Sequence, residues 1–179
     1  MKKGNRSAYD KLIPLLNIKK DDRILEIGYG HGIGIDTICQ NYDCTITGID
    51  FSELMFNEST ARNQRHIENK KVELDFGDYL DFDYSQASFD KIFFINVIYF
   101  WDNLKKPFNK INKELKHDGK LCIFMANRDD LKRLKFTKDD IFNKYTIDFV
   151  CEELEKSGFQ NINYKFDNGY FISCEKQTK

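Results

Sequence analysis

The chain lacks the features that mark membrane, secreted and nucleic-acid-binding proteins. No stretch approaches the roughly 18 consecutive apolar residues of a membrane-spanning helix, and no apolar run follows the amino-terminal residues as it would in a signal peptide. The formal net charge is -1, so no overall positive field exists to hold a polyphosphate chain. We therefore expect a cytoplasmic protein with no membrane contact and disfavour nucleic acid as its partner.

Paired cysteines are also absent. The 5 cysteines lie far apart in the sequence, include no Cys-x-x-Cys pair and are odd in number. This pattern argues against a zinc site and against a disulfide framework. We expect the cysteines to be small buried side chains in a reducing compartment, and we predict no metal site.

The chain does contain ample material for a hydrophobic core. Hydrophobic residues make up 41% of the sequence and include 16 Phe and 9 Tyr, a composition typical of folded globular proteins. A chain of this length buries roughly 70% of the surface that its unfolded form exposes, so it needs no metal or disulfide to fold. We predict a single domain over residues 1–179.

Patterns of strands and helices alternate along the sequence. A short amino-terminal helix is expected over residues 5–17, where Pro14 would end or bend it. A final pair of strands flanks Asp167-Asn168-Gly169, which is a strong hairpin signal. The other expected strands are 23–27, 44–49, 72–76, 92–95 and 120–126, and the other main helices are 33–42, 52–69, 104–115 and 146–157.

Alternating strands and helices predict an α/β fold with right-handed crossovers. We expect a three-layer Rossmann-like sandwich whose mostly parallel seven-stranded sheet ends in a carboxyl-terminal antiparallel hairpin. The strand at 92–95 is apolar without alternation and should lie at the sheet centre. The charged segment 127–145 is either a minimal cap over a binding site or a solvated helical face.

A glycine-rich loop, Glu26-Ile27-Gly28-Tyr29-Gly30-His31-Gly32, joins the first strand to the next helix. Its glycines permit tight turns and close ligand approach, and the helix that follows offers unpaired N–H groups to an anion. Ligands of such folds bind outside the carboxyl ends of the strands. A nicotinamide dinucleotide would require glycine at position 33, where the chain has Ile33, and Gly34 comes one residue late. A purely structural turn is the other alternative.

Asp50 ends the second predicted strand. A carboxylate at this position accepts hydrogen bonds from ribose hydroxyls in nucleotide-binding folds. The alternative is that Asp50 caps the helix that begins near Ser52.

With these features, nearly the whole chain resembles the class I S-adenosylmethionine-dependent methyltransferases. The loop resembles their first motif, Gly48 to Ser52 with Met55 the second, Phe76 to Tyr79 the third and Phe89 to Tyr99 the fourth. Residues 115–121 are similar to the turn before the fifth strand. The cofactor-binding residues that the resemblance implies are Glu26, Gly28, Tyr29, Gly30, Gly32, Asp50, Phe51, Met55, Gly77, Asp78, Tyr79, Asn96, Val97 and Ile98.

The resemblance also implies roles for several of these side chains. Asp50 would hold the ribose, Phe51 and Met55 would pack on the adenine, and Asp78 would meet the adenine amino group. Each has an alternative, since Asp78 could cap a turn, Met55 could be core packing and Asn96 could form a turn. The segment from Asn96 to Tyr99 lacks the two prolines of nucleobase and glutamine amino-methyltransferases, which weakens a nucleobase-amine acceptor.

Methyl transfer from a sulfonium depends mainly on positioning, which can lower a barrier by about 7 to 11 kcal/mol. No catalytic residue is assigned. His31 could be a base, but a loop or carboxylate-contact role is favoured. Tyr29, Tyr99, Phe100 and Trp101 are expected near the methyl group, with ordinary packing as the alternative. Tyr9 and Asp10 of the first helix could close over the cofactor.

The sequence thus predicts methyl transfer from S-adenosylmethionine, with S-adenosylhomocysteine as product, to an unidentified small-molecule acceptor. Two alternatives stay open: a non-catalytic S-adenosylmethionine-binding partner protein, and a methyltransferase acting on RNA or protein. Nothing in the sequence predicts an oligomeric state.

Overall fold

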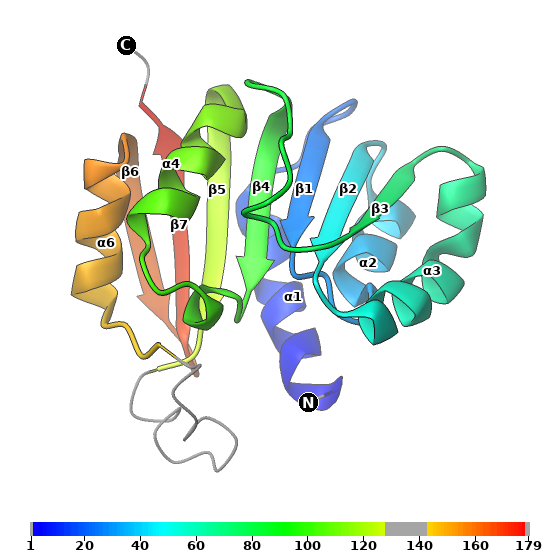
Figure 1. The fold of residues 1–179 in the computed structure, drawn as a ribbon, viewed down its shortest axis with the longest axis horizontal. Coiled ribbons are helices and arrows are strands. Elements are labelled where there is room, and N and C mark those ends of the chain that lie inside the picture. The colour runs from blue at the N-terminus through cyan, green and yellow to red at the C-terminus, as the bar shows by residue number, and fades with distance from the viewer. Residues whose placement is uncertain (1, 128–142, 178–179) are drawn as a thin grey trace.

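The computed structural model describes residues 2–127 and 143–177 and contains one seven-stranded sheet between two layers of helices (Figure 1). The strands are β1 (Arg23–Ile27), β2 (Thr45–Asp50), β3 (Val72–Phe76), β4 (Phe89–Ile95), β5 (Leu115–Met125), β6 (Phe159–Phe166) and β7 (Tyr170–Lys176). Their order across the sheet is β3-β2-β1-β4-β5-β7-β6. The pairings from β3 to β5 are parallel, and β7 runs antiparallel to β5 and β6. The predicted fold and the hairpin are confirmed, and β4 lies at the centre.

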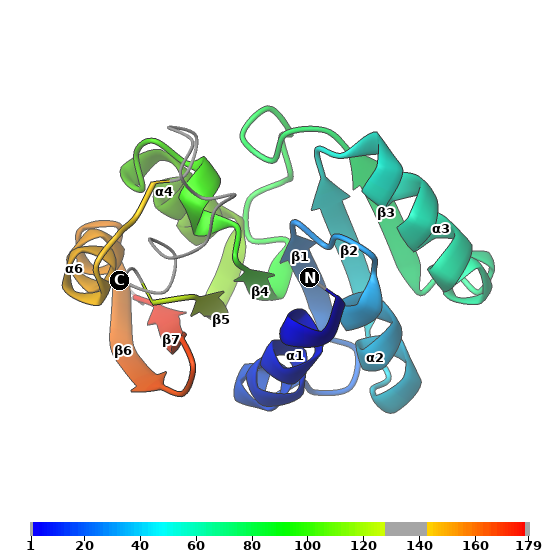
Figure 2. The same ribbon diagram turned by 90° about the horizontal axis from the view of Figure 1, so that it is seen from below.

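Helices cover both faces of this sheet. They are α1 (Lys2–Leu16), α2 (Ile33–Asn41), α3 (Glu53–Glu68), the short η1 (Ile98–Phe100), α4 (Lys105–Glu114) and α6 (Ile147–Lys156). α1 and α2 pack on one face with α3 beside β3, and α4 and α6 pack on the other (Figures 1 and 2). Among the described residues, no helix is long and apolar enough to cross a membrane.

Each face of the sheet has its own core. Phe93 of β4 belongs to the core beneath α1 and α2, and its neighbour Phe94 belongs to the core beneath α4 and α6. Both side chains are 0% exposed. This double burial explains why the sequence of β4 is apolar without alternation.

Pro14 was expected to end or bend the first helix, and it does not end it. α1 continues to Leu16, and the chain leaves it at Asn17, whose φ of 50° is left-handed. The amide of Asn17 donates to the carbonyl of Pro14 over 3.3 Å. A left-handed residue after the last turn ends the helix because it redirects the backbone.

The expected turn at His117-Asp118-Gly119 lies inside β5 rather than before it. Phe89 of β4 pairs with Leu115 and Lys91 pairs with Lys120, so the residues between Leu115 and Lys120 bulge out of register. Asp118 takes a left-handed φ of 58° within this bulge. β5 therefore begins at Leu115, five positions before the predicted start at 120, because residues on both sides of the turn pair with β4.

All five cysteines are free: Cys44, Cys122 and Cys174 are buried, and Cys39 and Cys151 are half-buried. Within residues 2–127 and 143–177, no three His, Cys, Asp or Glu side chains converge as a metal site. Of the expected cap at 127–145, residues 128–142 lie outside the described residues.

Candidate functional site

The candidate site lies at the carboxyl ends of β1, β2 and β4, the edge of the sheet that Figure 2 shows from below. Backbone hydrogen bonds join the loops at this edge. Gly28 N donates to the carbonyl of Ile49 over 2.7 Å, and Gly77 N donates to the carbonyl of Asp50 over 3.0 Å. The structure therefore brings together predicted residues from the first, second and third motifs.

The glycine loop uses all three of its glycines in left-handed backbone. The φ angles of Gly28, Gly30 and Gly32 are 71°, 53° and 70°. A Cβ on Gly28 would lie 2.4 Å from Val97, and one on Gly32 would lie 2.2 Å from Ser59. At Gly30 nothing lies within 4 Å of that position. The loop is thus enclosed on two sides and borders open space at Gly30, where a ligand can approach the backbone.

Gly34 provides a close contact between α2 and both β1 and α1. A Cβ on Gly34 would lie 2.3 Å from the Tyr9 ring and 2.9 Å from both carboxylate oxygens of Glu26. Ile33 begins α2 and is half-buried. Gly34 is one residue late only relative to the dinucleotide-binding spacing, and its position fits the packing of α2 on β1.

Glu26 carries a buried carboxyl group with one unused oxygen. The side chain is 0% exposed, and Oε1 accepts a hydrogen bond from the Tyr9 hydroxyl over 2.7 Å. Oε2 has no hydrogen-bond partner among the described residues. Burial raises the pKa of Glu26 to about 8, opposed by the Tyr9 hydrogen bond and reinforced by the charge of Asp50. A buried acceptor without a partner is costly, which favours a ligand donor at this position.

Asp50 ties the glycine loop to the start of α3. Its Oδ2 accepts from Gly30 N over 2.8 Å and its Oδ1 from Ser52 N over 2.9 Å. A carboxylate has about four acceptor positions, so these two bonds leave capacity for ribose hydroxyls. The side-chain cap of α3 is Ser52, whose Oγ accepts from Met55 N over 3.4 Å. The side chain that caps α3 is therefore that of Ser52 and not that of Asp50.

Two exposed aromatic rings lie beside Asp50. Phe51 is 60% exposed and Phe100 of η1 is 44% exposed, and their ring centroids are 5.6 Å apart in an edge-to-face arrangement. Met55 is half-buried in the first turns of α3. An apolar surface of this kind suits a flat heterocycle such as adenine.

In the third motif, Asp78 lies on the surface and Tyr79 lies in the core. Asp78 is exposed, and its Oδ1 accepts from Leu80 N over 2.9 Å, which is the turn-forming alternative. Gly77 has a φ of 153°, and a Cβ there would lie 2.6 Å from Phe82. Tyr79 is buried, and its hydroxyl donates to Glu114 Oε2 over 2.6 Å. The Tyr79 side chain therefore contacts α4, and its hydroxyl is engaged there.

The fourth motif forms the other wall of the glycine loop. Asn96 has a left-handed φ of 58° and accepts at Oδ1 from the Tyr99 hydroxyl over 3.1 Å, so it does form a turn. Val97 packs on Gly28, and Ile98 is buried. Asn143 N donates to the Tyr99 carbonyl over 2.9 Å. This hydrogen bond attaches Asn143 to η1.

Three of the four aromatic residues that were expected near the methyl group, Tyr29, Tyr99 and Trp101, are buried in the two cores. Tyr29 is 1% exposed and donates to the carbonyl of Asp75 over 3.0 Å, within the core beneath α1 and α2. Trp101 belongs to the core on the opposite face. Ordinary packing, the alternative, accounts for these buried rings, whereas Phe100 is 44% exposed and contacts Phe51.

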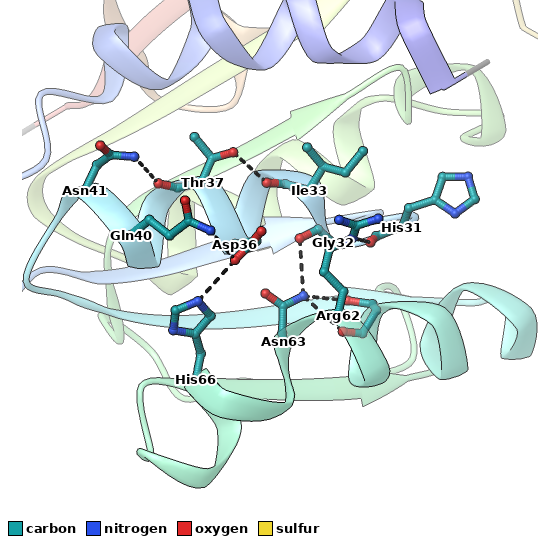
Figure 3. Close-up of polar contacts among 11 residues, drawn as sticks. His31, Gly32, Ile33, Asp36, Thr37, Gln40, Asn41, Arg62, Asn63 and His66 are labelled. Carbon is teal, nitrogen blue, oxygen red and sulfur yellow. Dashed lines mark hydrogen bonds and ion pairs between the residues drawn. The ribbon is translucent and has the colours of Figure 1, made fainter.

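His31 lies against α3. Its Nδ1 is 2.6 Å from Glu58 Oε2, and Arg62 Nε donates to the His31 carbonyl over 2.8 Å. The residue after Arg62 in α3 is Asn63, whose Nδ2 donates to the carbonyl of Gly32 over 3.2 Å (Figure 3). These partners of the loop were not predicted, although the four-residue spacing of Glu58 and Arg62 places both on one face of the helix.

Comparison with known proteins identifies the fold's relatives. A family model described as "Methyltransferase domain" matches residues 25–123, which is more than half of the chain. The uncharacterized methyltransferase YdaC of Bacillus subtilis is 28% identical over 165 residues, covering 92% of this chain and 86% of its own length.

Two phosphoethanolamine N-methyltransferases are also similar. The Plasmodium falciparum enzyme is 26% identical over 179 residues, covering 94% of this chain and 65% of its own length. The solved structure of the Haemonchus contortus enzyme 2, with phosphomonomethylethanolamine and S-adenosylhomocysteine, superposes with a TM-score of 0.83 at 16% identity. That match covers 96% of this chain and 53% of the other, so the chain spans less than two thirds of these two relatives. By its matched family domain, the chain belongs to the class I S-adenosylmethionine-dependent methyltransferases.

Proposed function

We propose that the chain transfers the methyl group of S-adenosylmethionine to a small-molecule acceptor. The observation that carries the proposal is the fully buried carboxyl group of Glu26, whose Oε2 has no partner among the described residues, beside a glycine loop that borders open space at Gly30. A cationic amino group such as that of the cofactor would satisfy this oxygen.

The remaining groups fit the other parts of the cofactor. Asp50 retains acceptor capacity for the two ribose hydroxyls, and Phe51 offers an exposed aromatic face to the adenine. Phe100 contacts Phe51 and would extend that apolar wall. The amides at the start of α2 would meet the cofactor carboxylate.

S-adenosylmethionine supplies a methyl group that is already activated by its sulfonium. The chain's residues would bind and orient it, and alignment of the acceptor requires no nucleophilic side chain. His31 would contribute through a contact with the cofactor carboxylate, because its side chain lies beside the glycine loop and contacts Glu58 through Nδ1. The Glu58 carboxylate orients the ring at the mouth of the loop.

A small-molecule acceptor is supported by charge and by the relatives. The net charge of -1 gives no broad attraction to RNA. Curated relatives that name an acceptor include phosphoethanolamine N-methyltransferases and a 27-O-demethylrifamycin SV methyltransferase. Those names describe small molecules of different kinds, so they support the size class of the acceptor and not its identity.

Calorimetric titration with S-adenosylhomocysteine tests the cofactor site. We expect saturable binding, and the absence of heat at millimolar ligand would contradict the proposal. Turnover is then measured as S-adenosylhomocysteine production with a panel of amine, hydroxyl and thiol metabolites, and with RNA and protein extracts as separate arms. Turnover confined to the macromolecular arms would favour the RNA or protein alternative, and binding without any turnover would favour the non-catalytic partner.

A further inference from the structure

We propose that Tyr9 of α1 is a positioning residue that orients the Glu26 carboxylate toward the amino group of the cofactor, and so makes α1 part of the cofactor site. This inference rests on the proposed function, because it concerns the same site. It assigns to α1 a role beyond covering the sheet. Figures 1 and 2 show the amino-terminal end of α1 at the same edge of the sheet as the glycine loop.

Tyr9 reaches Glu26 through a gap that exists only because residue 34 is glycine. The Tyr9 ring is 5% exposed and lies 2.3 Å from the Cβ position of Gly34. Its hydroxyl donates to Glu26 Oε1 over 2.7 Å. Ring, glycine and carboxyl group are therefore in direct contact at the meeting point of α1, α2 and β1.

The hydrogen bond determines what the other carboxylate oxygen can do. With Oε1 held by Tyr9, rotation of the carboxyl group is restricted and Oε2 keeps a fixed direction. Oε2 is buried and has no partner among the described residues. A fixed, unsatisfied carboxylate oxygen binds an ammonium group more tightly than one that must first reorient.

The rest of α1 is held to the sheet independently of Tyr9. Leu12 and Leu16 are 0% exposed in the core, and Lys11 Nζ lies 2.7 Å from Asp167 Oδ2 in the hairpin turn. Loss of the Tyr9 hydroxyl should therefore leave α1 in place. A cavity of about 400 Å³ beside Tyr9 is also lined by Tyr42, which supplies a matched control.

Three titratable groups among the described residues interact with Glu26: Tyr9 from α1, Asp50 from β2 and Tyr29 from the glycine loop. Burial raises the pKa of Glu26 to about 8, so the ligand-free carboxyl group is mostly protonated at neutral pH. An ammonium group binds the ionised form, so ligand binding should release a proton and strengthen as the pH rises toward 8. The Tyr9 hydrogen bond favours ionisation, so its loss should move this pH dependence upward.

The test compares two ligands and three proteins. S-adenosylhomocysteine carries the amino group, and 5′-methylthioadenosine lacks it. Both are titrated calorimetrically into wild type, Tyr9→Phe and Tyr42→Phe between about pH 6 and about pH 9. Tyr9→Phe is expected to weaken S-adenosylhomocysteine binding by about 3- to 12-fold, the equivalent of one ordinary hydrogen bond. Its pH profile should shift upward, its affinity for 5′-methylthioadenosine should not change, and Tyr42→Phe should match wild type.

The outcomes separate this inference from the proposed function. If wild type does not bind S-adenosylhomocysteine, the proposed function fails. If wild type binds and Tyr9→Phe shows the same affinity and pH profile, the role of Tyr9 is overturned. If Tyr9→Phe lost equal affinity for both ligands, Tyr9 would have only a structural role, and the proposed positioning role would also be overturned.

Glu26→Gln keeps the proposal testable if Tyr9→Phe does not fold. This variant should bind S-adenosylhomocysteine weakly and without the wild-type pH dependence. Where Tyr9→Phe does fold, combining it with Glu26→Gln should cause no further selective loss. A wild-type pH profile in Glu26→Gln would show that this carboxyl group does not meet the ligand, and would overturn the proposal.

Discussion

At Gly34 the first turn of α2 touches both α1 and β1. We predict that Gly34→Ala lowers the free energy of unfolding by about 1 to 3 kcal/mol, because the new methyl group would overlap the Tyr9 ring and the Glu26 carboxyl group. Urea denaturation measures the change. Gln40→Ala, an exposed substitution on the same helix, should stay within about 0.5 kcal/mol of wild type. Equal stability of the two variants would refute the close contact.

Glu26 should make the stability of the ligand-free protein depend on pH. Its pKa rises from 4.5 to about 8 on folding, so the stabilising contribution of the protonated group is fully present below pH 4.5 and is lost as the pH rises through about 8. The slope from this one group approaches about 1.4 kcal/mol per pH unit at most within that window.

Glu26→Gln isolates that contribution because glutamine does not titrate. We predict that the free energy of unfolding of wild type falls relative to Glu26→Gln between about pH 5 and about pH 8. The measurement is a urea unfolding curve for both proteins at several pH values. A difference between them that stays constant with pH would show that the folded-state pKa of Glu26 is not raised.

Among the elements, α3 begins at the proposed cofactor site, whereas α6 begins far from it in the sequence. Both helices have side-chain caps of the same kind, since Ser52 Oγ accepts from Met55 N over 3.4 Å and Thr146 Oγ1 accepts from Phe149 N over 3.3 Å. The two caps therefore form a matched pair in which only the first is joined to Asp50.

We predict that Ser52→Ala and Thr146→Ala each lower the free energy of unfolding by about 1 kcal/mol. Only Ser52→Ala should weaken S-adenosylhomocysteine binding, by up to about fivefold, because fraying of α3 loosens the amide that orients Asp50. Thermal unfolding and calorimetry measure the two effects. Equal ligand affinity in both variants would show that the start of α3 does not contribute to S-adenosylhomocysteine binding.

The crossover from β3 to β4 is held by contacts with residues that are distant in the sequence. Residues 77–88 contain no helix or strand, yet Tyr79 donates to Glu114 over 2.6 Å and Lys110 contacts the same carboxylate at 2.7 Å. Burial raises the pKa of Glu114, and the bonds from Lys110 and Tyr79 oppose that rise. This buried polar group fixes the loop of the third motif to α4.

Local patterns were sufficient to predict most elements of this fold. Apolar runs and the Asp-Asn-Gly turn depend on neighbours in sequence, and both appear in the structure. The bulge in β5 was missed because it depends on pairing with β4. A single chain also does not reveal which helix packs on a loop, so the contacts of Gly34 and of His31 with Glu58 were missed.

In the whole molecule, the sheet joins two hydrophobic cores that do not otherwise form one cluster. The core beneath α1 and α2 contains Phe93, and the core beneath α4 and α6 contains Phe94 and Trp101. The rings of Phe94 and Trp101 meet edge to face at 5.1 Å. Trp101 is the 1 Trp of the chain, so its fluorescence reports on one core only.

We predict that the two cores unfold together, because the strand β4 supplies alternate residues to both. Phe93→Ala and Phe94→Ala should each lower the free energy of unfolding by about 3 to 5 kcal/mol, as the loss of a buried phenyl ring leaves a cavity. In Phe93→Ala, the urea midpoints from Trp101 fluorescence and from far-UV circular dichroism should fall equally. If the dichroism midpoint fell while the fluorescence midpoint kept its wild-type value, the two faces would be separate cooperative units, and damage on the α1 side would leave the α4 side folded.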